Sequence, residues 1–148
     1  MAEGDPRAAH TSFEKALQRD DTSLVTLLNY ADFHRAQGND TEAEGLLTRA
    51  TSLYPDSADA HLALGLLRVR QKRTAEAIPE LARAVQLAPT NSNYAYVYAV
   101  GLYSTGEVDS AVSVLEKARA RFPANAQIEN AVQAYCADQK QQGALTGT

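Results

Sequence analysis

The sequence has few of the residues that build disulfides, membrane spans or export signals. Its single cysteine, Cys136, excludes an internal disulfide and a metal cage of cysteine ligands. No apolar run approaches the roughly 18 residues of a membrane-spanning helix, so we expect no membrane insertion. The N-terminus, Met1 to Asp5, is polar and lacks the apolar core of a secretory signal. The cytoplasm is therefore the default compartment, although the sequence leaves the true compartment unknown.

Runs of positive charge are also missing from the chain. The net charge is −4 and the isoelectric point is about 5.3, and the lysines and arginines are spread along the sequence. Nucleic acids and acidic membrane surfaces attract clustered basic residues, so neither is predicted as a partner. Hydrophobic residues make up 45% of the 148 residues, which is enough for the core of one domain.

Motifs of catalysis and cofactor binding are absent as well. The sequence contains no glycine-rich phosphate loop, no His-Glu-x-x-His and no Gly-x-Ser-x-Gly. His10, His34 and His61 are scattered, and we expect His34 to form hydrogen bonds at the surface or in a groove. Cys136 is expected to be a small buried hydrophobic residue, because a reactive thiol needs electropositive surroundings. No catalytic residue, metal site or cofactor is predicted, and the protein is not expected to be an enzyme.

A period of 34 residues runs along the chain. Pro55, Pro89 and Pro123 are separated by this step. The same step relates five sets of other residues, namely Ala43/Ala77/Ala111, Leu47/Leu81/Leu115, Ala50/Ala84/Ala118, Tyr30/Leu64/Tyr98 and Ala31/Gly65/Ala99. Five sets in one phase indicate an internal structural repeat.

Each repeat predicts two helices joined by a tight turn. From Ala58 to about Gln71 the residues are good helix formers with leucines around a wide arc. Lys72 and Arg73 then interrupt the pattern, and a second apolar stripe with spacings of three and four follows. Pro89 ends that second helix, because the residue before a proline avoids the helical conformation. Pro79 lies within the second helix, where we expect a bend and not an end.

The neighbouring segments repeat this plan. Gly38 and Gly106 occupy the turn between the two helices, where glycine adopts a left-handed backbone at low cost, and Lys72 holds that position in the middle unit. The predicted division is a half-repeat at 6–23, repeats at 24–57, 58–91 and 92–125, and a terminal capping helix at 126–140, with flexible ends at 1–5 and 141–148.

Small residues are predicted where the two helices of a hairpin cross. Antiparallel helices pack at about 8–10 Å, and the closest crossings need small side chains. Ala31, Gly65 and Ala99 would lie at these crossings, and the alanines at 43, 77 and 111 would face them.

These residues resemble the tetratricopeptide repeat family. The motif is best preserved in the unit 58–91, with Leu64-Gly65, Ala77, Leu81, Ala84 and Pro89. The resemblance covers roughly residues 6–140. It implies an all-α fold, a right-handed α-solenoid of antiparallel helix hairpins, and a role as a protein-protein interaction scaffold.

The run from Asn93 to Gly106 also resembles the repeat arrays at the C-terminal end of some bacterial multihaem cytochrome-like proteins. No haem-attachment motif (Cys-x-x-Cys-His) occurs in this chain, so any haem would belong to another part of a longer protein. The resemblance implies an accessory, non-catalytic domain of a larger redox protein as an alternative function, with a periplasmic location.

The resemblance to the repeat family also implies where a partner binds. In that family, the first helix of each hairpin lines the concave side of the solenoid. Mapped by phase, the candidate groove residues are Leu28, Asp32, Arg35, Leu62, Leu66, Val69, Arg70, Tyr96, Val100 and Tyr103, with Val25, Asp59 and Asn93 at related positions. An apolar centre with tyrosine and arginine, which often carry interface energy, suits a peptide or partner protein.

Two alternatives for these surfaces stay open. Leu62, Leu66 and Val69 could pack against a neighbouring helix or a dimer partner. Residues 6–19 carry an apolar stripe with Phe13 and Leu17, which, if exposed, predicts a homo-oligomer through the N-terminal half-repeat.

Overall fold

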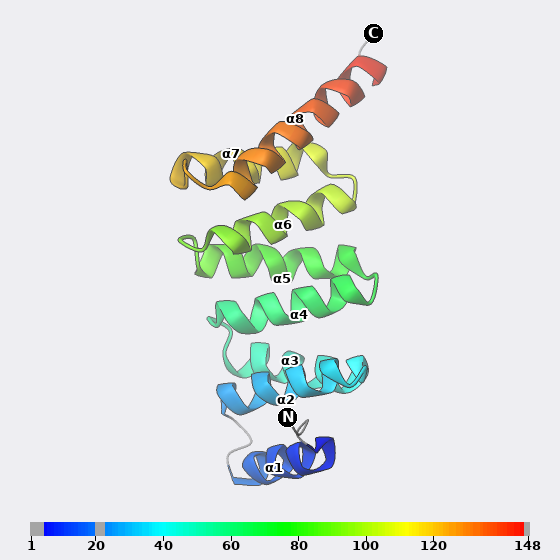
Figure 1. Ribbon diagram of the computed structural model, residues 1–148, viewed down its shortest axis with the longest axis vertical. Helices are drawn as coiled ribbons and strands as arrows, with labels where there is room; N and C mark the ends of the chain where they lie inside the picture. The colour runs from blue at the N-terminus through cyan, green and yellow to red at the C-terminus, as the bar shows by residue number, and fades with distance from the viewer. Residues whose placement is uncertain (1–4, 20–22, 147–148) are drawn as a thin grey trace.

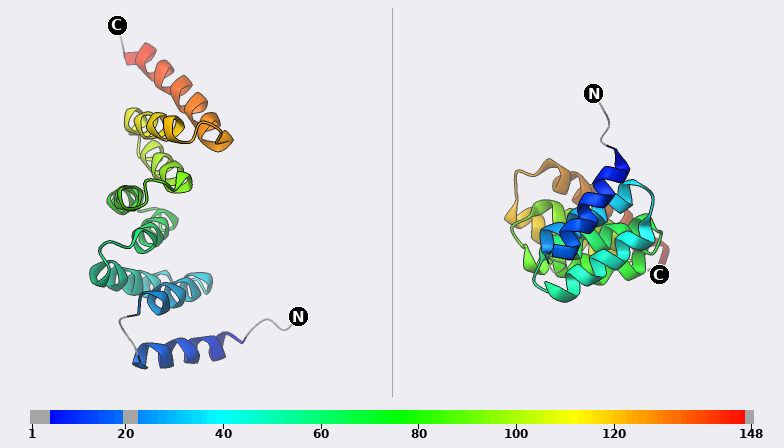
Figure 2. Two further views of the ribbon diagram at one scale, coloured as in Figure 1. Left: turned by 90° about the vertical axis from the view of Figure 1, so that its left-hand side faces the viewer. Right: turned by 90° about the horizontal axis from the view of Figure 1, so that it is seen from below.

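The computed structural model describes residues 5–19 and 23–146 (Figure 1). Over these residues the chain forms eight α-helices and no strand. They are α1 (Pro6–Arg19), α2 (Leu24–Ala36), α3 (Asp40–Leu53), α4 (Ala58–Arg70), α5 (Thr74–Leu87), α6 (Ser92–Ser104), α7 (Val108–Arg121) and α8 (Ala126–Thr146). The helices stack in chain order along one long axis, and α1 and α8 lie at opposite ends of this column (Figures 1 and 2).

Each helix packs mainly on its neighbours in the sequence. Helix α4 pairs with α5 in a hairpin and also contacts α3 and α2, and α6 likewise contacts α5, α7 and α8. Of the helices described, the second helix α5 contacts only α4 and α6 to a comparable extent. The first helices of the hairpins, α2, α4 and α6, therefore need apolar residues around a wide arc. This explains why their sequences lack the single narrow stripe of α5.

The first helices share a side-chain cap that recurs at the repeat period. The Ser57 hydroxyl accepts a hydrogen bond from the Ala60 amide at 3.2 Å, and the Asn125 side chain accepts one from the Ile128 amide at 3.0 Å. Ser23 and Asn91 cap α2 and α6 in the same manner. Such a cap contributes about 1 kcal/mol, so each repeat defines the start of its own first helix.

The turns inside the hairpins contain a left-handed residue at the predicted position. The backbone angle φ is +79° at Gly38, +61° at Lys72 and +88° at Gly106. Lysine holds this conformation at a cost of about 1–2 kcal/mol that glycine avoids. The three hairpins therefore share one turn geometry despite the different residue in the middle.

The close crossing within the middle hairpin depends on a glycine. A Cβ atom added at Gly65 would lie 2.7 Å from Leu81 Cδ2 and 3.5 Å from the carbonyl oxygen of Ala77. Ala31, Ala77 and Ala99 are each at most 2% exposed. The predicted crossing of small residues is confirmed at these positions.

The C-terminal helix is longer than predicted. Helix α8 continues to Thr146, beyond the predicted end of the capping helix at residue 140, so residues 141–146 of the expected flexible end are helical. The segment has no proline, and Gly143 alone lowers helix stability by only about 1 kcal/mol. Residues 1–4 and 147–148, for which flexible ends were also predicted, lie outside the described residues. Helix α5 continues through Pro79, as expected from the sequence.

The apolar stripe of α1 is covered by the chain itself. The Phe13 ring stacks on Tyr30 of α2, with centroids 5.2 Å apart, and Leu17 packs against a cluster that contains Leu27 and Ala50. Phe13 and Leu17 are thus half-buried against the chain itself, so less of the stripe is open to a second copy than predicted. A homo-oligomer through this half-repeat stays a prediction.

A histidine pair also lies between α1 and α2. The His34 side chain is only 8% exposed, and its Nδ1 atom has no hydrogen-bond partner among the described residues. Its ring lies 5.9 Å from that of His10, which meets the Tyr30 hydroxyl at 3.0 Å. Burial lowers the pKa of His34, and His10 lowers it further, against the opposing effect of Glu42. His34 is therefore buried between helices and not at the surface or in a groove as predicted, and its Nδ1 atom does not form the expected hydrogen bond within the described residues.

Candidate protein-binding groove

A hollow of about 540 Å³ lies between α2 and α4. Leu28, Asp32 and Arg35 face it from α2, at spacings that place them on one side of the helix. Leu66 and Arg70 face it from α4 at the same kind of spacing. Ala31, Leu47, Asp59 and Ala63 complete its lining.

A second hollow of about 230 Å³ lies between α4 and α6. Leu66 and Val69 contribute from α4, and Tyr96, Val100 and their neighbours from α6. The full lining is Leu66, Val69, Tyr96, Val97, Val100 and Gly101. Since Leu66 lines both hollows, they form one continuous surface over three repeats, which we call the groove.

The groove exposes large hydrophobic side chains. Leu66 is 43% exposed, and Val69 and Val100 are each 36% exposed. Val25 on α2 is exposed too. Apolar residues gathered in this way on a folded protein mark an interaction surface, because exposed apolar area gains free energy when a partner covers it.

Charged groups of both signs border the α2–α4 hollow. Arg35 donates to Asp32 Oδ1 from Nη2 at 2.6 Å and from Nε at 3.0 Å, and Arg70 lies 3.5 Å from Asp40. The Arg35–Asp32 pair is largely exposed and the Arg70–Asp40 pair is partly exposed, so each contributes about 1 kcal/mol or less to stability. They remain available to a partner, because a solvated pair exchanges its bonds at little cost.

Asp59 is held more firmly than the other charged groups of the groove. The Tyr94 hydroxyl of α6 donates a hydrogen bond to Asp59 Oδ1. Burial, together with this hydrogen bond, raises the pKa of Tyr94 to about 12. The contact joins adjacent repeats and orients the carboxylate at the edge of the hollow.

The structure brings eight of the ten predicted groove residues together in the two hollows. They are Leu28, Asp32, Arg35, Leu66, Val69, Arg70, Tyr96 and Val100. Leu62 is half-buried and lines neither hollow. Tyr103 is engaged by α8, since it donates to Asp138 at 2.8 Å and stacks on Tyr135 with centroids 4.1 Å apart. Whether any of these residues binds a partner stays a prediction.

The groove also contains residues that the sequence mapping missed. Ala63, Val97 and Gly101 line it. Ala63 is three residues before Leu66, Val97 is three residues before Val100, and Gly101 is four residues after Val97. Their helical spacing from predicted residues was an available signal, but small side chains drew no attention as binding residues.

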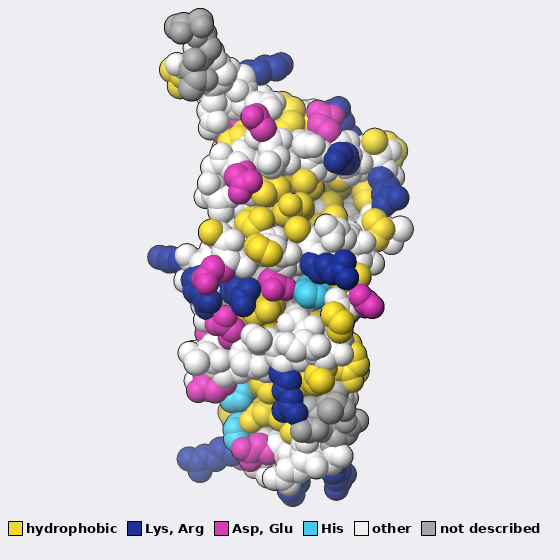
Figure 3. Space-filling view, turned by 180° about the vertical axis from the view of Figure 1, so that it is seen from behind, with side chains coloured by type: hydrophobic (Ala, Val, Ile, Leu, Met, Phe, Trp, Pro, Cys, Tyr) yellow, Lys and Arg dark blue, Asp and Glu magenta, His cyan; other side chains and the backbone are white. Residues whose placement is uncertain are grey.

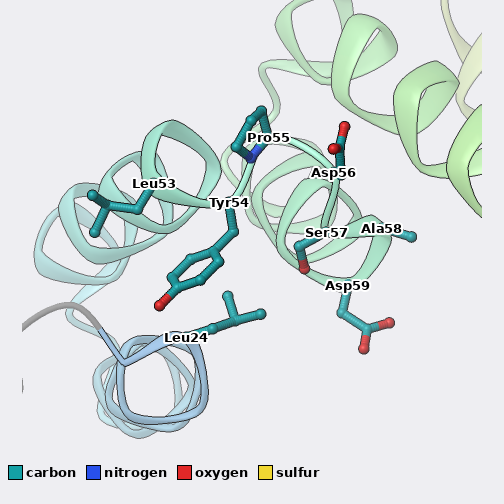
Figure 4. A pocket seen from close by; sticks show the side chains of 8 residues that line it. All are labelled: Leu24, Leu53, Tyr54, Pro55, Asp56, Ser57, Ala58 and Asp59. Carbon is teal, nitrogen blue, oxygen red and sulfur yellow. The ribbon is translucent and has the colours of Figure 1, made fainter.

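A further cavity of about 580 Å³ lies where the α3–α4 loop meets the start of α2 (Figure 4). Leu24 and the Tyr54 ring face each other across it, whereas the carboxylates of Asp56 and Asp59 point away (Figure 4). Asp59 lines both this cavity and the α2–α4 hollow, so the groove continues toward the N-terminal end of α2.

Comparisons with known proteins identify the repeat. Residues 1–67 and 68–135 both match the family model described as the tetratricopeptide repeat. The chain belongs to the tetratricopeptide repeat family. Proteins of this family are in general protein-interaction scaffolds with concave binding surfaces, and the match confirms the family predicted from the sequence.

Solved tetratricopeptide proteins share the fold. A crystal structure of MamA superposes with a TM-score of 0.81 at 24% identity, covering 93% of this chain and 80% of that chain. YrrB, described as a tetratricopeptide protein with an unusual peptide-binding site, gives a TM-score of 0.77 at 20% identity, covering 91% and 70%. The predicted all-α right-handed solenoid is confirmed. No curated protein matches the chain.

The tetratricopeptide assignment does not test the expectation of a larger, cytochrome-like parent protein. The family match and these structures give no support to a cytochrome-like parent, which stays a prediction. Within residues 5–19 and 23–146, no helix has the length and apolar character to cross a membrane.

Proposed function

We propose that the groove of this tetratricopeptide protein binds a polypeptide segment with two apolar anchor residues. The observation that carries the proposal is the continuous apolar surface over α2, α4 and α6, with Leu66 at its centre. One anchor enters the α2–α4 hollow and the other the smaller α4–α6 hollow. Because both hollows are open at the surface, either a helix or an extended segment suits them.

The charges around the larger hollow support a polypeptide ligand with both polar and apolar groups. Arg35 and Arg70 can donate hydrogen bonds to the carboxylates or carbonyl oxygens of a segment. Asp32 and Asp59 can accept hydrogen bonds from its amides or cationic groups. Arginine and tyrosine, both present here, often dominate binding energy at interfaces. The peptide-binding site of YrrB, a protein with the same fold, also supports this kind of ligand.

A peptide library displayed on phage tests the proposal. Peptides selected on the wild-type chain are measured by fluorescence polarisation against Leu66→Glu, which places a charge between the two hollows. We expect affinity to fall at least tenfold, about 1.4 kcal/mol, because the charge must lose its water when an anchor enters. Leu66 is 43% exposed, so the folded state tolerates the change.

The matched control is Leu145→Glu, which adds the same charge at an exposed leucine of α8. Helix α8 extends away from the column there (Figure 1), so we expect unchanged affinity. Selected peptides that bind Leu66→Glu as tightly as the wild type would show that the binding site lies elsewhere.

A further inference from the structure

A separate cavity of about 450 Å³ lies between α5, α6 and α7. Its floor is apolar, with the Tyr98 ring, Val114 and Phe122 as the large side chains. The complete lining is Val85, Pro89, Ala95, Tyr98, Val114, Lys117, Ala118, Arg121 and Phe122. The volume falls in the range of known ligand pockets. We call it the α5–α7 cavity.

The α5–α7 cavity is distinct from the groove. Tyr98 lines the cavity, whereas Tyr96, two residues earlier on α6, lines the groove. Two residues on a helix are about 200° apart, so α6 presents one tyrosine to each site. Seen from behind, a broad patch of hydrophobic side chains covers the molecule at the height of α5 to α7 (Figure 3).

The cavity carries positive charge at one end. Lys117 and Arg121 are four residues apart on α7 and therefore lie side by side. Arg121 donates from Nη1 to the Pro89 carbonyl at 2.7 Å, which fixes its stem beside the cavity. Neither cation has an ion pair with any described carboxylate, and none of the nine lining residues is acidic. The C-terminal end of helix α7 carries a partial negative charge of roughly one half from the helix dipole. The positive charges of Lys117 and Arg121 together exceed it.

Negative charge lies at the opposite end. Glu107, which precedes α7, acts on Tyr98, whose pKa is raised by burial first and by this carboxylate second. In Figure 3, lysine and arginine atoms lie to the right of the hydrophobic patch, and acidic atoms lie to its left as well as above and below it. A ligand with a carboxylate is thus oriented with that group toward Arg121.

We propose that the α5–α7 cavity binds an acidic peptide. One bulky apolar side chain of the peptide fills the space between Tyr98, Val114 and Phe122, and carboxylates directly after it pair with Lys117 and Arg121. Charge complementarity selects this occupant, since a basic segment would meet two unpaired cations. The site works independently of the groove, so this tetratricopeptide protein holds two polypeptide segments at once.

Three peptides of about ten residues test the proposal. The first has a central phenylalanine followed by three glutamates, the second replaces the glutamates with lysines, and the third replaces the phenylalanine with alanine. We expect only the first to shift the backbone NMR signals of residues lining the α5–α7 cavity. Its affinity should fall at least tenfold in Lys117→Glu/Arg121→Glu, and also in high salt, which screens exposed charges.

The matched control is Arg35→Glu, which reverses a cation of the groove and should leave this affinity unchanged. Equal binding of the lysine peptide, shifts confined to the groove, or no binding at millimolar concentration would overturn the proposal. Undiminished affinity in Lys117→Glu/Arg121→Glu would do the same. If that variant does not fold, salt titration of the wild-type complex decides, because an affinity independent of salt excludes the carboxylate contacts.

Discussion

The α4–α5 hairpin and the α1–α2 junction place equivalent positions of the repeat in different surroundings. In the hairpin, Leu64 and Leu81 are each 1% exposed, and the alanine at 77 is fully buried. In the junction, the position equivalent to Leu81 is Phe13, which is only half-buried, and no residue of α1 is fully buried. The position within the repeat therefore determines which residue faces the adjacent helix. The number of side chains packed around that residue determines how much it contributes to stability.

The α4–α5 hairpin and the α1–α2 junction also differ in the kinds of side chain that they bury. Aliphatic side chains and a glycine form the buried centre of the hairpin, and the ion pairs His61–Glu80 and Arg68–Glu80 join its two helices outside that centre. The junction is built from Phe13, Tyr30, Phe33 and two histidines. One of these, His34, is buried, and its Nδ1 atom has no partner in the part of the chain that the structure describes. We therefore expect the hairpin to behave as the stable centre of the solenoid and α1 as its least stable helix.

The largest effect is expected from Leu81→Ala in the hairpin. The substitution leaves a cavity beside Gly65 and should lower the free energy of unfolding by about 2–5 kcal/mol. Urea denaturation followed by circular dichroism measures it. A loss below about 1 kcal/mol would contradict the central role of this contact.

Phe13→Ala should have a smaller and more local effect. Phe13 is half-buried, so we expect a loss of about 1–2 kcal/mol, below the range for fully buried phenylalanine. In hydrogen exchange, amides of α1 should lose protection while those of α4 and α5 keep theirs. Equal loss in both regions would mean that the solenoid unfolds as one unit, and that the comparison above is wrong.

Lys72→Gly should widen the difference in stability by strengthening the hairpin. Glycine removes the cost of a left-handed lysine, about 1–2 kcal/mol, but it also gains freedom in the unfolded chain. A net stabilisation of about 0.5–1 kcal/mol is expected from the urea midpoint. Gly106→Ala, at the equivalent turn, is the control and should destabilise.

The smallest effect is a pH dependence at the junction. Because the folded pKa of His34 is below its usual 6.5, the folded state favours the neutral ring. Stability from this residue is complete above pH 6.5 and is lost as the pH falls through 6.5 toward the lower folded pKa. The urea midpoint of the wild type should therefore fall more steeply between pH 7.5 and 5 than that of His34→Gln. Parallel slopes would assign the pH dependence to other groups.

Much of the fold could be predicted because residues at equivalent positions of the repeat have equivalent surroundings. Gly65 and Lys72 were assigned to a crossing and a turn from their phase alone, and the structure places them there. The groove face followed from the same phase, since Leu28 and Leu66 lie on the first helices. The caps at Ser57 and Asn125 were missed, although they too follow the period.

The features that could not be predicted depend on how particular helices dock on one another, which the repeat period does not determine. Tyr103 lies on the predicted helix face, but Asp138 and Tyr135 of α8 engage it, and the sequence does not show how α8 docks. His34 was expected to form hydrogen bonds because the packing of Phe13 and His10 from α1 was unknown. The α5–α7 cavity likewise requires side chains from three helices.

Leu66 forms the wall shared by both hollows of the groove, and a shared wall makes the two hollows interdependent. A rotamer of Leu66 that enlarges one hollow takes space from the other. In the proposed complex, we therefore expect the sizes of the two anchor residues to depend on each other, with a large residue in one hollow favouring a small one in the other. In a double-mutant cycle on the ligand, the two anchors should show a coupling energy although they never touch each other.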